Sequence, residues 1–521
     1  MMRTMGVAQK ETLVVKKFRE LPENQKINLI ILFIGIISFL IAANILNAFF
    51  LGEDEALFIR LARSVLDYMR RGDFRNFCAS LLSHDHPPIP ILMVTPFIYF
   101  MGYNEAALRM PNILLWAVNC MVATKIGWRL SGLRTGILTG LFLAISGIFD
   151  FQGLGFGAAG ETLSVLLLIN ILIDDFEWHL ETRRARMKYL WGGVYLAIGY
   201  MFFTSTLPVI AFYHLVFLYK LLKANPNKIA FRNYVFYTLP VVGFYLAYNA
   251  VFLGIPAYDM YFYGVGPYGQ LRQNLGRAGV SHLNIESLGV NLRILNWYVF
   301  PFTSWMVLLT GIYYQIRKYS RIFIILGGYG AIWSFYLMGN TGQHFLAYFC
   351  WLAPFGIATI DQLILKLKGK IGIILWAVVF MCMFIWTYYA HIKTYTYDNY
   401  PRSLVSITWG ENLGWINNIY RPMHKIANTL DENLGPNGKF ISIIDGALVL
   451  YYFPDETKSI NSQLVEIQQE STEPCLWMSL DTVKSNKIRA VVSYANQTVC
   501  PEIVGEVINY PGSNLKLTLL K

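Results

Sequence analysis

The chain has 521 residues, of which 55% are hydrophobic and only 14% are charged, so it is too apolar for an ordinary soluble protein. Its formal net charge of +11 could indicate a nucleic-acid partner. In membrane proteins, however, Lys and Arg gather on cytoplasmic loops and set the orientation. We therefore expect a polytopic α-helical membrane protein with no nucleic-acid partner.

The first apolar segment covers residues 27–50 and is long enough to cross a bilayer. It exceeds the apolar core of a signal peptide, and no small-residue cleavage site follows it, so a retained span is predicted. The basic residues just ahead of the apolar stretch include Lys16, Lys17, Arg19 and Lys26. They predict a cytoplasmic N-terminus, which places residue 52 and its successors outside.

An amphipathic helix is predicted from Leu57 onward, because Leu57, Leu61, Val65 and Met69 recur at four-residue spacing. The polar side of that helix carries Arg60, Arg63, Asp67, Arg70 and Arg71. This pattern is typical of a helix lying in the membrane interface, and simple anchoring through lipid phosphates is its plainest explanation.

Residues 89–101 are apolar, but 13 helical residues rise only about 20 Å, too little to cross a bilayer. Pro90 and Pro96 weaken a span further. We predict a second helix at the outer membrane surface, so that residues 52–105 form a single external loop with interfacial helices.

Ten further spans are predicted, which gives about 11 crossings in all. Their ranges are 107–128, 135–150, 162–176, 189–204, 207–222, 234–253, 297–316, 321–338, 344–362 and 371–391. The predicted cytoplasmic loops are 128–134, 179–188, 223–228, 317–321 and 366–370. All five are basic, as orientation by positive charge requires.

Three carboxylates, Glu53, Asp54 and Glu55, follow the first span directly. An ionised acid at this depth is costly unless it is paired, so a functional role is favoured for Asp54 and Glu55. Helix capping is the alternative explanation for one of the acids, but it does not account for three.

Four other polar clusters lie on the same external side of the membrane, according to the predicted order of the 11 crossings. The first, residues 83–90, holds His84, Asp85 and His86 before a Pro-Pro step, and a zinc site is the alternative interpretation there. The other three are a glycine-rich turn ending at Glu161, an external loop 254–296 with Arg272 and Arg277, and a helix start at Gln343 and His344. Acids, histidines and arginines on one side of a membrane suit a reaction on a phosphate-bearing lipid.

The last segment, 392–521, has short strand-like stretches at 439–445, 489–494, 506–510 and 515–520. We predict a small external α/β domain. Cys475 and Cys500 are its only cysteines, and outside the cell they could form a disulfide; two buried free thiols are the alternative.

The motifs Asp54-Glu55-Ala56, Gly72-Asp73, the acid-His-Pro-Pro of 85–88, and the segments 102–112 and 131–146 occur in an order that resembles the GT-C fold glycosyltransferases. That group uses lipid-phosphate sugars and includes family 39, the protein O-mannosyltransferases and the lipid A aminoarabinose transferases. The resemblance implies residues 1–391 as a transmembrane catalytic module and 392–521 as an extracytoplasmic domain. It also implies a bacterial or archaeal relative, in the cell membrane.

The resemblance further implies that Asp54 is the active-site acid of the first external loop, with Glu55 as its partner. Asp85 and His86 match the acid and basic residue before the Pro-Pro pair, and Glu161 stands where many relatives have Asp. The expected donor is a polyprenyl-phosphate sugar, and the acceptor is a glycan, lipid or protein. No cofactor is expected, although His84, Asp85 and His86 leave a divalent cation open.

The residues also suggest the chemistry. A sugar on a lipid phosphate already has a good leaving group. One base, Asp54, and a few positively charged side chains therefore suffice for an inverting transfer. His86, Arg272 and His344 are the candidates for stabilising the departing phosphate, and Arg277 lies in the same loop as Arg272. The rival functions are a lipid-linked sugar flippase or transporter, and a lipid scaffold whose acids only cap helices.

Overall fold

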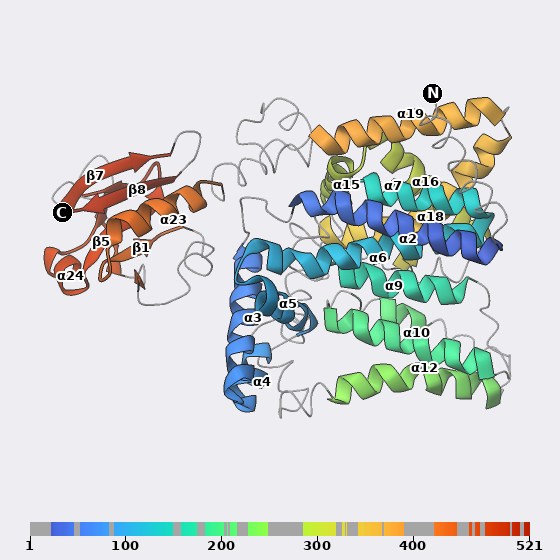
Figure 1. Ribbon diagram of the computed structural model, residues 1–521, viewed down its shortest axis with the longest axis horizontal. Coiled ribbons are helices and arrows are strands. Elements are labelled where there is room, and N and C mark those ends of the chain that lie inside the picture. The colour runs from blue at the N-terminus through green and yellow to red at the C-terminus, as the bar shows by residue number, and fades with distance from the viewer. Residues whose placement is uncertain are drawn as a thin grey trace, which may run out of the picture.

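The computed structural model shows a helical bundle followed by a small domain with two β-sheets (Figure 1). It describes residues 22–45, 53–82, 88–149, 158–173, 183–202, 206, 209–215, 228–247, 285–318, 326–328, 330, 342–366, 369–389, 421–444, 458–460, 464–468, 475–500, 503–510 and 515–521.

Most helices of the bundle overlap predicted spans, and α15, which lies mostly in the predicted loop 254–296, is the exception. They are α2 Glu23–Ala42 with η1 Ala43–Ile45, α6 Glu105–Ser131, α7 Leu133–Ile145, α9 Ala158–Leu172, α10 Arg183–Phe202, α12 Lys228–Ala247, α15 Ile285–Tyr298, α16 Pro301–Lys318, α18 Gly342–Leu365 and α19 Gly369–Thr387. In the described part of the chain, three helical stretches are long and apolar enough to cross a membrane: Glu23–Ala42, Glu105–Ser131 and Phe345–Leu365.

Four shorter apolar helices, Ile89–Met101, Leu133–Ile145, Ala158–Ile171 and Ile371–Thr387, join these three. Most of the predicted spans 207–222 and 321–338 lies outside the described residues. The total of 11 crossings therefore stays a prediction.

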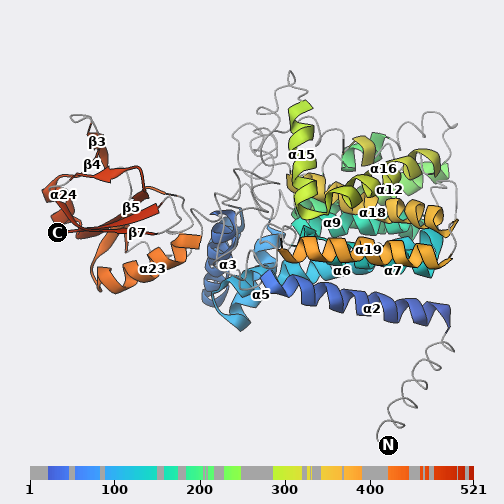
Figure 2. The same ribbon diagram turned by 90° about the horizontal axis from the view of Figure 1, so that it is seen from above.

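The long helices of the bundle lie side by side around one apolar core, and α15 runs across them (Figures 1 and 2). The closest pairs are α6 with α7, α16 with α18, α10 with α12, and α2 with α6. The core contains large side chains that are fully buried, among them Trp116, Trp351 and Phe142. Helix α18 is buried over most of its length, because α6, α7, α9 and α16 all pack against it.

Buried hydrogen bonds and an ion pair connect α7, α18 and α19. The carboxylate of Asp361, only 1% exposed, accepts a hydrogen bond from Thr135 Oγ1 at 2.9 Å and lies 3.0 Å from Arg134 Nε. The indole of Trp376 also donates to Asp361, at 3.3 Å. A buried carboxylate is costly without partners, and here α7 and α19 supply them to α18.

Helices α10 and α12 approach closely at Gly193. A Cβ at this position would collide with the backbone carbonyl oxygen of Tyr237, so only glycine allows this packing. We predict that Gly193→Ala destabilises the protein by about 1–3 kcal/mol, measured as the thermal unfolding of the purified protein in detergent. Gly243, on α12, has nothing within 4 Å of its added Cβ and is the matched control. Gly243→Ala should leave stability unchanged or raise it, and an unchanged Gly193→Ala protein would contradict the packing.

Three helices cross one end of the bundle: α3 Glu53–Arg71, α4 Phe74–Leu82 and α5 Ile89–Met101. Helix α3 runs across the direction of the long helices in both views (Figures 1 and 2), as expected for a helix in the membrane interface. The predicted short helix over 89–101 is confirmed as α5, with the same bounds. We call this side of the bundle the α3 end.

The predicted apolar face of α3 is partly confirmed, since Val65 is buried and Leu57 and Leu61 are half-buried, but the buried stripe is shifted by about one residue. The buried residues are Phe58, Ile59, Ala62, Val65 and Leu66, whereas Met69 is 57% exposed. The reason is tertiary packing: α4, α5 and α6 all contact α3, and they bury a different stripe from the one with four-residue spacing.

Residues 421–521 form the smaller domain beyond the α3 end (Figure 1). Its elements are α23 Arg421–Leu434, β1 Lys439–Ser442, β2 Ser459–Ile460, β3 Glu466–Gln468, β4 Cys475–Trp477, α24 Leu480–Ser485, β5 Ile488–Tyr494, β6 Thr498–Val499, β7 Val504–Asn509 and β8 Leu515–Leu520. The predicted strands are confirmed as β1, β5, β7 and β8, and they lie in one sheet of order β2-β1-β5-β8-β7. Buried apolar residues of this domain belong to the same cluster as those of α3 and α5.

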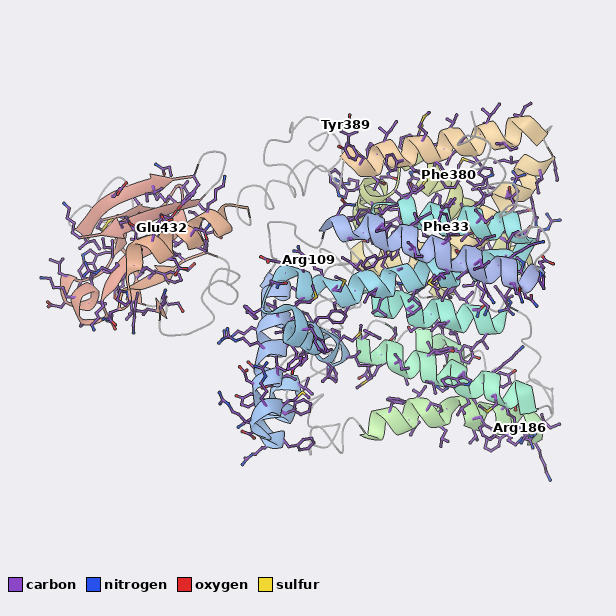
Figure 3. All side chains as sticks on the ribbon, viewed as in Figure 1. Phe33, Arg109, Arg186, Phe380, Tyr389 and Glu432 are labelled. Atoms are coloured by element: carbon purple, nitrogen blue, oxygen red, sulfur yellow. A yellow bond between two sulfur atoms is a disulfide. The ribbon has the colours of Figure 1, made fainter. Side chains whose placement is uncertain are left out.

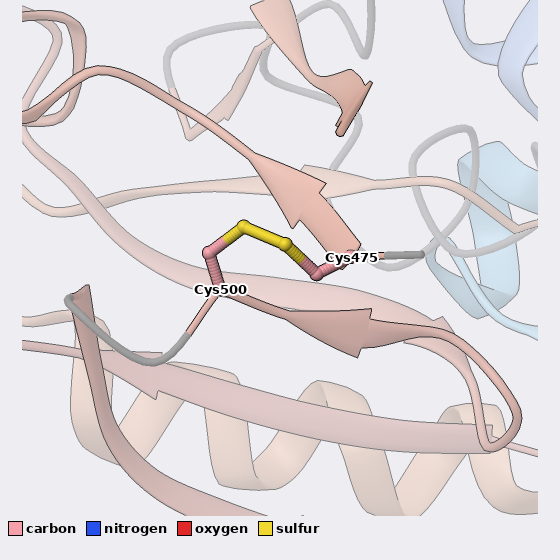
Figure 4. Close-up of a disulfide and its surroundings, with 2 residues drawn as sticks. All are labelled: Cys475 and Cys500. Carbon is pink, nitrogen blue, oxygen red and sulfur yellow. A yellow bond between two sulfur atoms is a disulfide. The ribbon is translucent and has the colours of Figure 1, made fainter. Parts of the chain in front are cut away.

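The second sheet, of order β3-β4-β6, carries a disulfide between Cys475 and Cys500 (Figure 4). The predicted bond is confirmed, with the two Cα atoms 5.3 Å apart. It joins β4 to the end of β6, two strands that pair in parallel. The other cysteines with described side chains, Cys120, Cys350 and Cys382, are free.

Candidate functional site

Asp54 and Glu55 lie in the first turn of α3, at the end opposite Arg70 and Arg71. Negative charge at a helix start and positive charge at its end both agree with the helix dipole. The backbone of this turn is described, but the side chains of residues 53–56 are outside the described residues. The helix dipole favours acids at this position, and the role of Asp54 in chemistry stays a proposal.

The motif Gly72-Asp73 has a structural explanation. Gly72 has a φ of +68°, a left-handed conformation that suits the sharp turn between α3 and α4. Asp73 precedes α4 and accepts a hydrogen bond from the backbone N–H of Asn76 at 3.1 Å and from its side-chain amide at 2.6 Å. These bonds hold the pKa of Asp73 below its usual value. The motif serves to start α4.

Glu161 opens α9 and is almost completely buried, with 1% of its side chain exposed. Two neighbouring helices hold this turn by hydrogen bonds to its backbone. Asn119 Nδ2 on α6 donates to the carbonyl oxygen of Ala159 at 2.9 Å, and Trp351 Nε1 on α18 donates to that of Thr162 at 3.2 Å. Glu161 therefore lies inside the bundle, at the junction of α6, α9 and α18.

Helix α6 contacts α3, α9 and α18. These three helices carry candidate residues, so α6 connects the parts of the proposed site. One face of α6 is unusually polar for a buried helix: Arg109, Asn112 and Asn119 are at most 3% exposed. Figure 3 shows Arg109 at the α3 end of the bundle. Buried Trp116 Nε1 and Asn119 Oδ1 have no hydrogen-bond partner within the described residues.

This polar face is a feature that the analysis of the sequence missed. Its signal is present in the chain, since residues 109, 112, 116 and 119 have the spacing of one helix face within an otherwise apolar span. Buried polar groups in membrane helices are costly and mark functional positions.

His344 lies in the first turn of α18, with its side chain outside the described residues. Trp351, which contacts the turn of Glu161, follows seven residues later, or about 10 Å along the helix. The first turn of α18 and Glu161 are therefore at different depths, with Glu161 deeper in the bundle.

The remaining candidates, Asp85, His86, Arg272 and Arg277, lie outside the described residues. One part of the predicted external loop 254–296 was wrong, because residues 285–298 form helix α15 and pack against α16 and α18. Its buried asparagine Asn291 is 0% exposed, and Asn296 accepts a hydrogen bond from Ser304 Oγ at 2.8 Å. Local hydrophobicity was too weak there to predict a helix.

Solved structures share this architecture. ArnT from Cupriavidus metallidurans bound to undecaprenyl phosphate matches with a TM-score of 0.56 and 11% identity, over 96% of this chain and 98% of ArnT. The apo state of the same protein gives 0.53 with the same identity and coverage. The oligosaccharyltransferase AglB from Archaeoglobus fulgidus, in complex with an inhibitory peptide and a dolichol-phosphate, gives 0.49 and 12% identity, over 89% of this chain and 69% of AglB.

No protein-family model matches the chain, and no curated protein matches its sequence. The likeness to ArnT extends over both the helical bundle and the smaller C-terminal domain, because nearly the whole of each chain is covered. The chain is a helical membrane protein with the GT-C fold, as the resemblance in its sequence predicted.

Proposed function

We propose that the protein is a membrane glycosyltransferase that moves a sugar from a polyprenyl-phosphate donor to a hydroxyl or phosphate acceptor. The observation that carries this proposal is the match over nearly the full length of both chains with ArnT, whose structure holds undecaprenyl phosphate. The acids in the first turn of α3, which follows the first candidate span in the sequence, supply a candidate base for the reaction.

The reaction needs one base and a site for a phosphate. A glycosyl phosphate already has a stable leaving group, so its departure requires stabilisation of negative charge rather than protonation by a second acid. In our proposal Asp54 takes the proton of the acceptor hydroxyl, which attacks the anomeric carbon from the face opposite the phosphate and inverts that centre. Glu55 assists Asp54.

The remaining candidate residues are proposed to bind the donor. His86, Arg272, Arg277 and His344 are proposed to hold the lipid phosphate, and Asp85 precedes His86 at the start of the same segment. Glu161 is proposed to bind the sugar of the donor, from a position deeper in the bundle than the first turn of α18. A carboxylate with this burial is suited to hydrogen bonds with sugar hydroxyls.

The proposed setting is a cell membrane with the N-terminus on the cytoplasmic side and residues 392–521 on the extracytoplasmic side. The basic loops predicted on the opposite side from α3 support this orientation. We propose the family-39 enzymes and mannosyltransferases as analogues, and the proposed acceptor is a glycan, lipid or protein.

The function can be tested with a panel of radiolabelled polyprenyl-phosphate sugars, incubated with membranes that contain the protein. We expect one donor to lose its sugar to an endogenous acceptor, with release of free polyprenyl phosphate. Binding of the donors with no sugar transfer would favour a carrier for lipid-linked sugars instead.

The role of Glu161 gives a separate prediction. Glu161→Gln preserves the size of the side chain and removes its charge, so transfer should fall at least tenfold because contacts to the donor weaken. The matched control is Glu105→Gln, which changes a half-buried glutamate in the first turn of α6. Transfer by the Glu105 variant should stay within twofold of wild type. Equal activities of both variants would remove Glu161 from the site.

A further inference from the structure

A cluster of exposed arginines and aromatic rings lies where α3 ends, α4 begins and α5 ends. Its aromatic rings are unusually accessible: Phe74 is 68%, Tyr99 57% and Phe100 80% exposed. Arg70, Arg71 and Arg75 are exposed beside them. We call these six residues the arginine–aromatic patch.

Direct contacts join three members of the patch, namely Arg70, Tyr99 and Phe100. The guanidinium carbon of Arg70 lies 5.5 Å from the centre of the Tyr99 ring, and Tyr99 meets Phe100 edge to face with ring centres 5.0 Å apart. On the other side of the α3–α4 turn, the ring of Phe74 stacks on that of Phe77 at 5.8 Å. The turn itself is fixed by Gly72 and by the capping bonds of Asp73. Arg70, Tyr99 and Phe100 are therefore joined by contacts within the protein, and Phe74 is packed on Phe77.

The patch lies close to the end of a candidate membrane span. Tyr99 and Phe100 end α5, and α6, the span that starts at Glu105, follows after a short turn. Helix α3 runs across the spans at this level (Figure 1). Aromatic rings and arginines are the residues that proteins place in the headgroup layer of a bilayer, where the ring is half wet and the guanidinium reaches phosphate.

The charge of this region is positive. Five arginines and two aspartates occupy residues 57–82, which leaves a charge of +3. One aspartate, Asp67, lies 3.9 Å from Arg70, and both side chains are largely in solvent, so this pair neutralises Arg70 weakly. The carboxylate of Asp73 accepts two hydrogen bonds from Asn76 at the start of α4. The helix dipole explains a preference for Arg70 and Arg71 at the end of α3, but it explains neither Arg75 nor the exposed rings.

We propose that the arginine–aromatic patch binds the headgroups of anionic glycerophospholipids, with the rings between the upper acyl chains and the arginines on the phosphates. Three guanidinium groups with fork-shaped donors match phosphate oxygens, and the anionic headgroup supplies the charge that this surface lacks. This site is separate from the proposed sugar transfer, which uses the opposite end of α3. The patch would fix the height of α3 and α5 relative to the bilayer.

The test is native mass spectrometry of the purified full chain with phosphatidylglycerol or phosphatidylcholine added in detergent. Wild type is expected to retain phosphatidylglycerol in preference to phosphatidylcholine. The triple variant Arg70→Gln, Arg71→Gln, Arg75→Gln should bind phosphatidylglycerol roughly tenfold more weakly. The variant with lysine at the same three positions keeps the charge and should retain most of the binding. Arg489→Gln, an exposed arginine on β5, is the matched control and should bind as wild type does.

Several results would overturn the proposal. One is equal binding of the two lipids by wild type. Another is unchanged phosphatidylglycerol binding by the glutamine variant, with its thermal midpoint confirming that it is folded. Displacement of phosphatidylglycerol by equimolar undecaprenyl phosphate would also contradict the proposal, because the patch would then be part of the donor site. If the glutamine variant does not fold, Tyr99→Ala with Phe100→Ala replaces it, and undiminished binding by that variant counts against the patch.

Discussion

Asp54→Asn is expected to abolish sugar transfer, with a loss of at least 100-fold in the rate at saturating donor. The amide keeps the shape of the side chain but cannot accept the proton of the acceptor hydroxyl, and general-base catalysis typically contributes about 10²–10⁴-fold. Donor binding should change little, because the proposed phosphate ligands lie on other segments. The measurement is transfer of radiolabelled sugar by the purified variant, together with its affinity for the donor.

A matched control is available on the same helix. Asp67, 42% exposed, also lies on α3 but more than three turns away from Asp54. Asp67→Asn should transfer sugar within twofold of wild type. If the two variants were equally active, Asp54 would be only a helix-capping residue, and if both were inactive, the loss would reflect damage to α3 rather than to a base.

Removal of the disulfide between Cys475 and Cys500 should destabilise the C-terminal domain by about 3 kcal/mol. Cys475 and Cys500 are separated by 25 positions, and a crosslink of this length removes substantial conformational entropy from the unfolded chain. The double variant Cys475→Ser, Cys500→Ser should therefore lower the urea midpoint for cleavage of residues 421–521 in pulse proteolysis of the full chain.

Cys382→Ser serves as the control for this experiment. Cys382 is a free, half-buried cysteine on α19, so its loss should leave the midpoint of the C-terminal domain unchanged. Wild type treated with reductant should behave as the double variant does. A midpoint that responds neither to reductant nor to the double substitution would mean that the bond does not form in the protein. That result would also remove an argument for an oxidising compartment outside the membrane.

Hydrophobic periodicity was sufficient to predict the long helices and the strands. Segments such as 107–128 and 515–520 are uniform enough that local sequence determines α6 and β8, and the length of 89–101 correctly predicted a short helix. Where several helices meet, the sequence was a weaker guide. The stripe that α3 buries depends on α4, α5 and α6, and α15 is stabilised by α16 and α18 rather than by its own hydrophobicity.

For the site, sequence predicted which segments carry reactive groups but not how deep they lie. The amphipathic helix was predicted from Leu57 onward, and α3 begins at Glu53, so Asp54 and Glu55 lie in its first turn. Burial of Glu161 and the polar face of α6 with Arg109 and Asn119 depend on contacts between distant helices. No spacing within a single segment can predict such contacts.

Sugar transfer from a lipid donor is tested most directly in proteoliposomes that contain the purified protein, a polyprenyl-phosphate sugar labelled in both its sugar and its lipid, and an acceptor extract. We expect the sugar label to leave the lipid and free polyprenyl phosphate to appear in equal amount, with wild type but not with Asp54→Asn. An intact donor that only moves between the two leaflets would contradict this expectation, and the protein would then be a carrier of lipid-linked sugar.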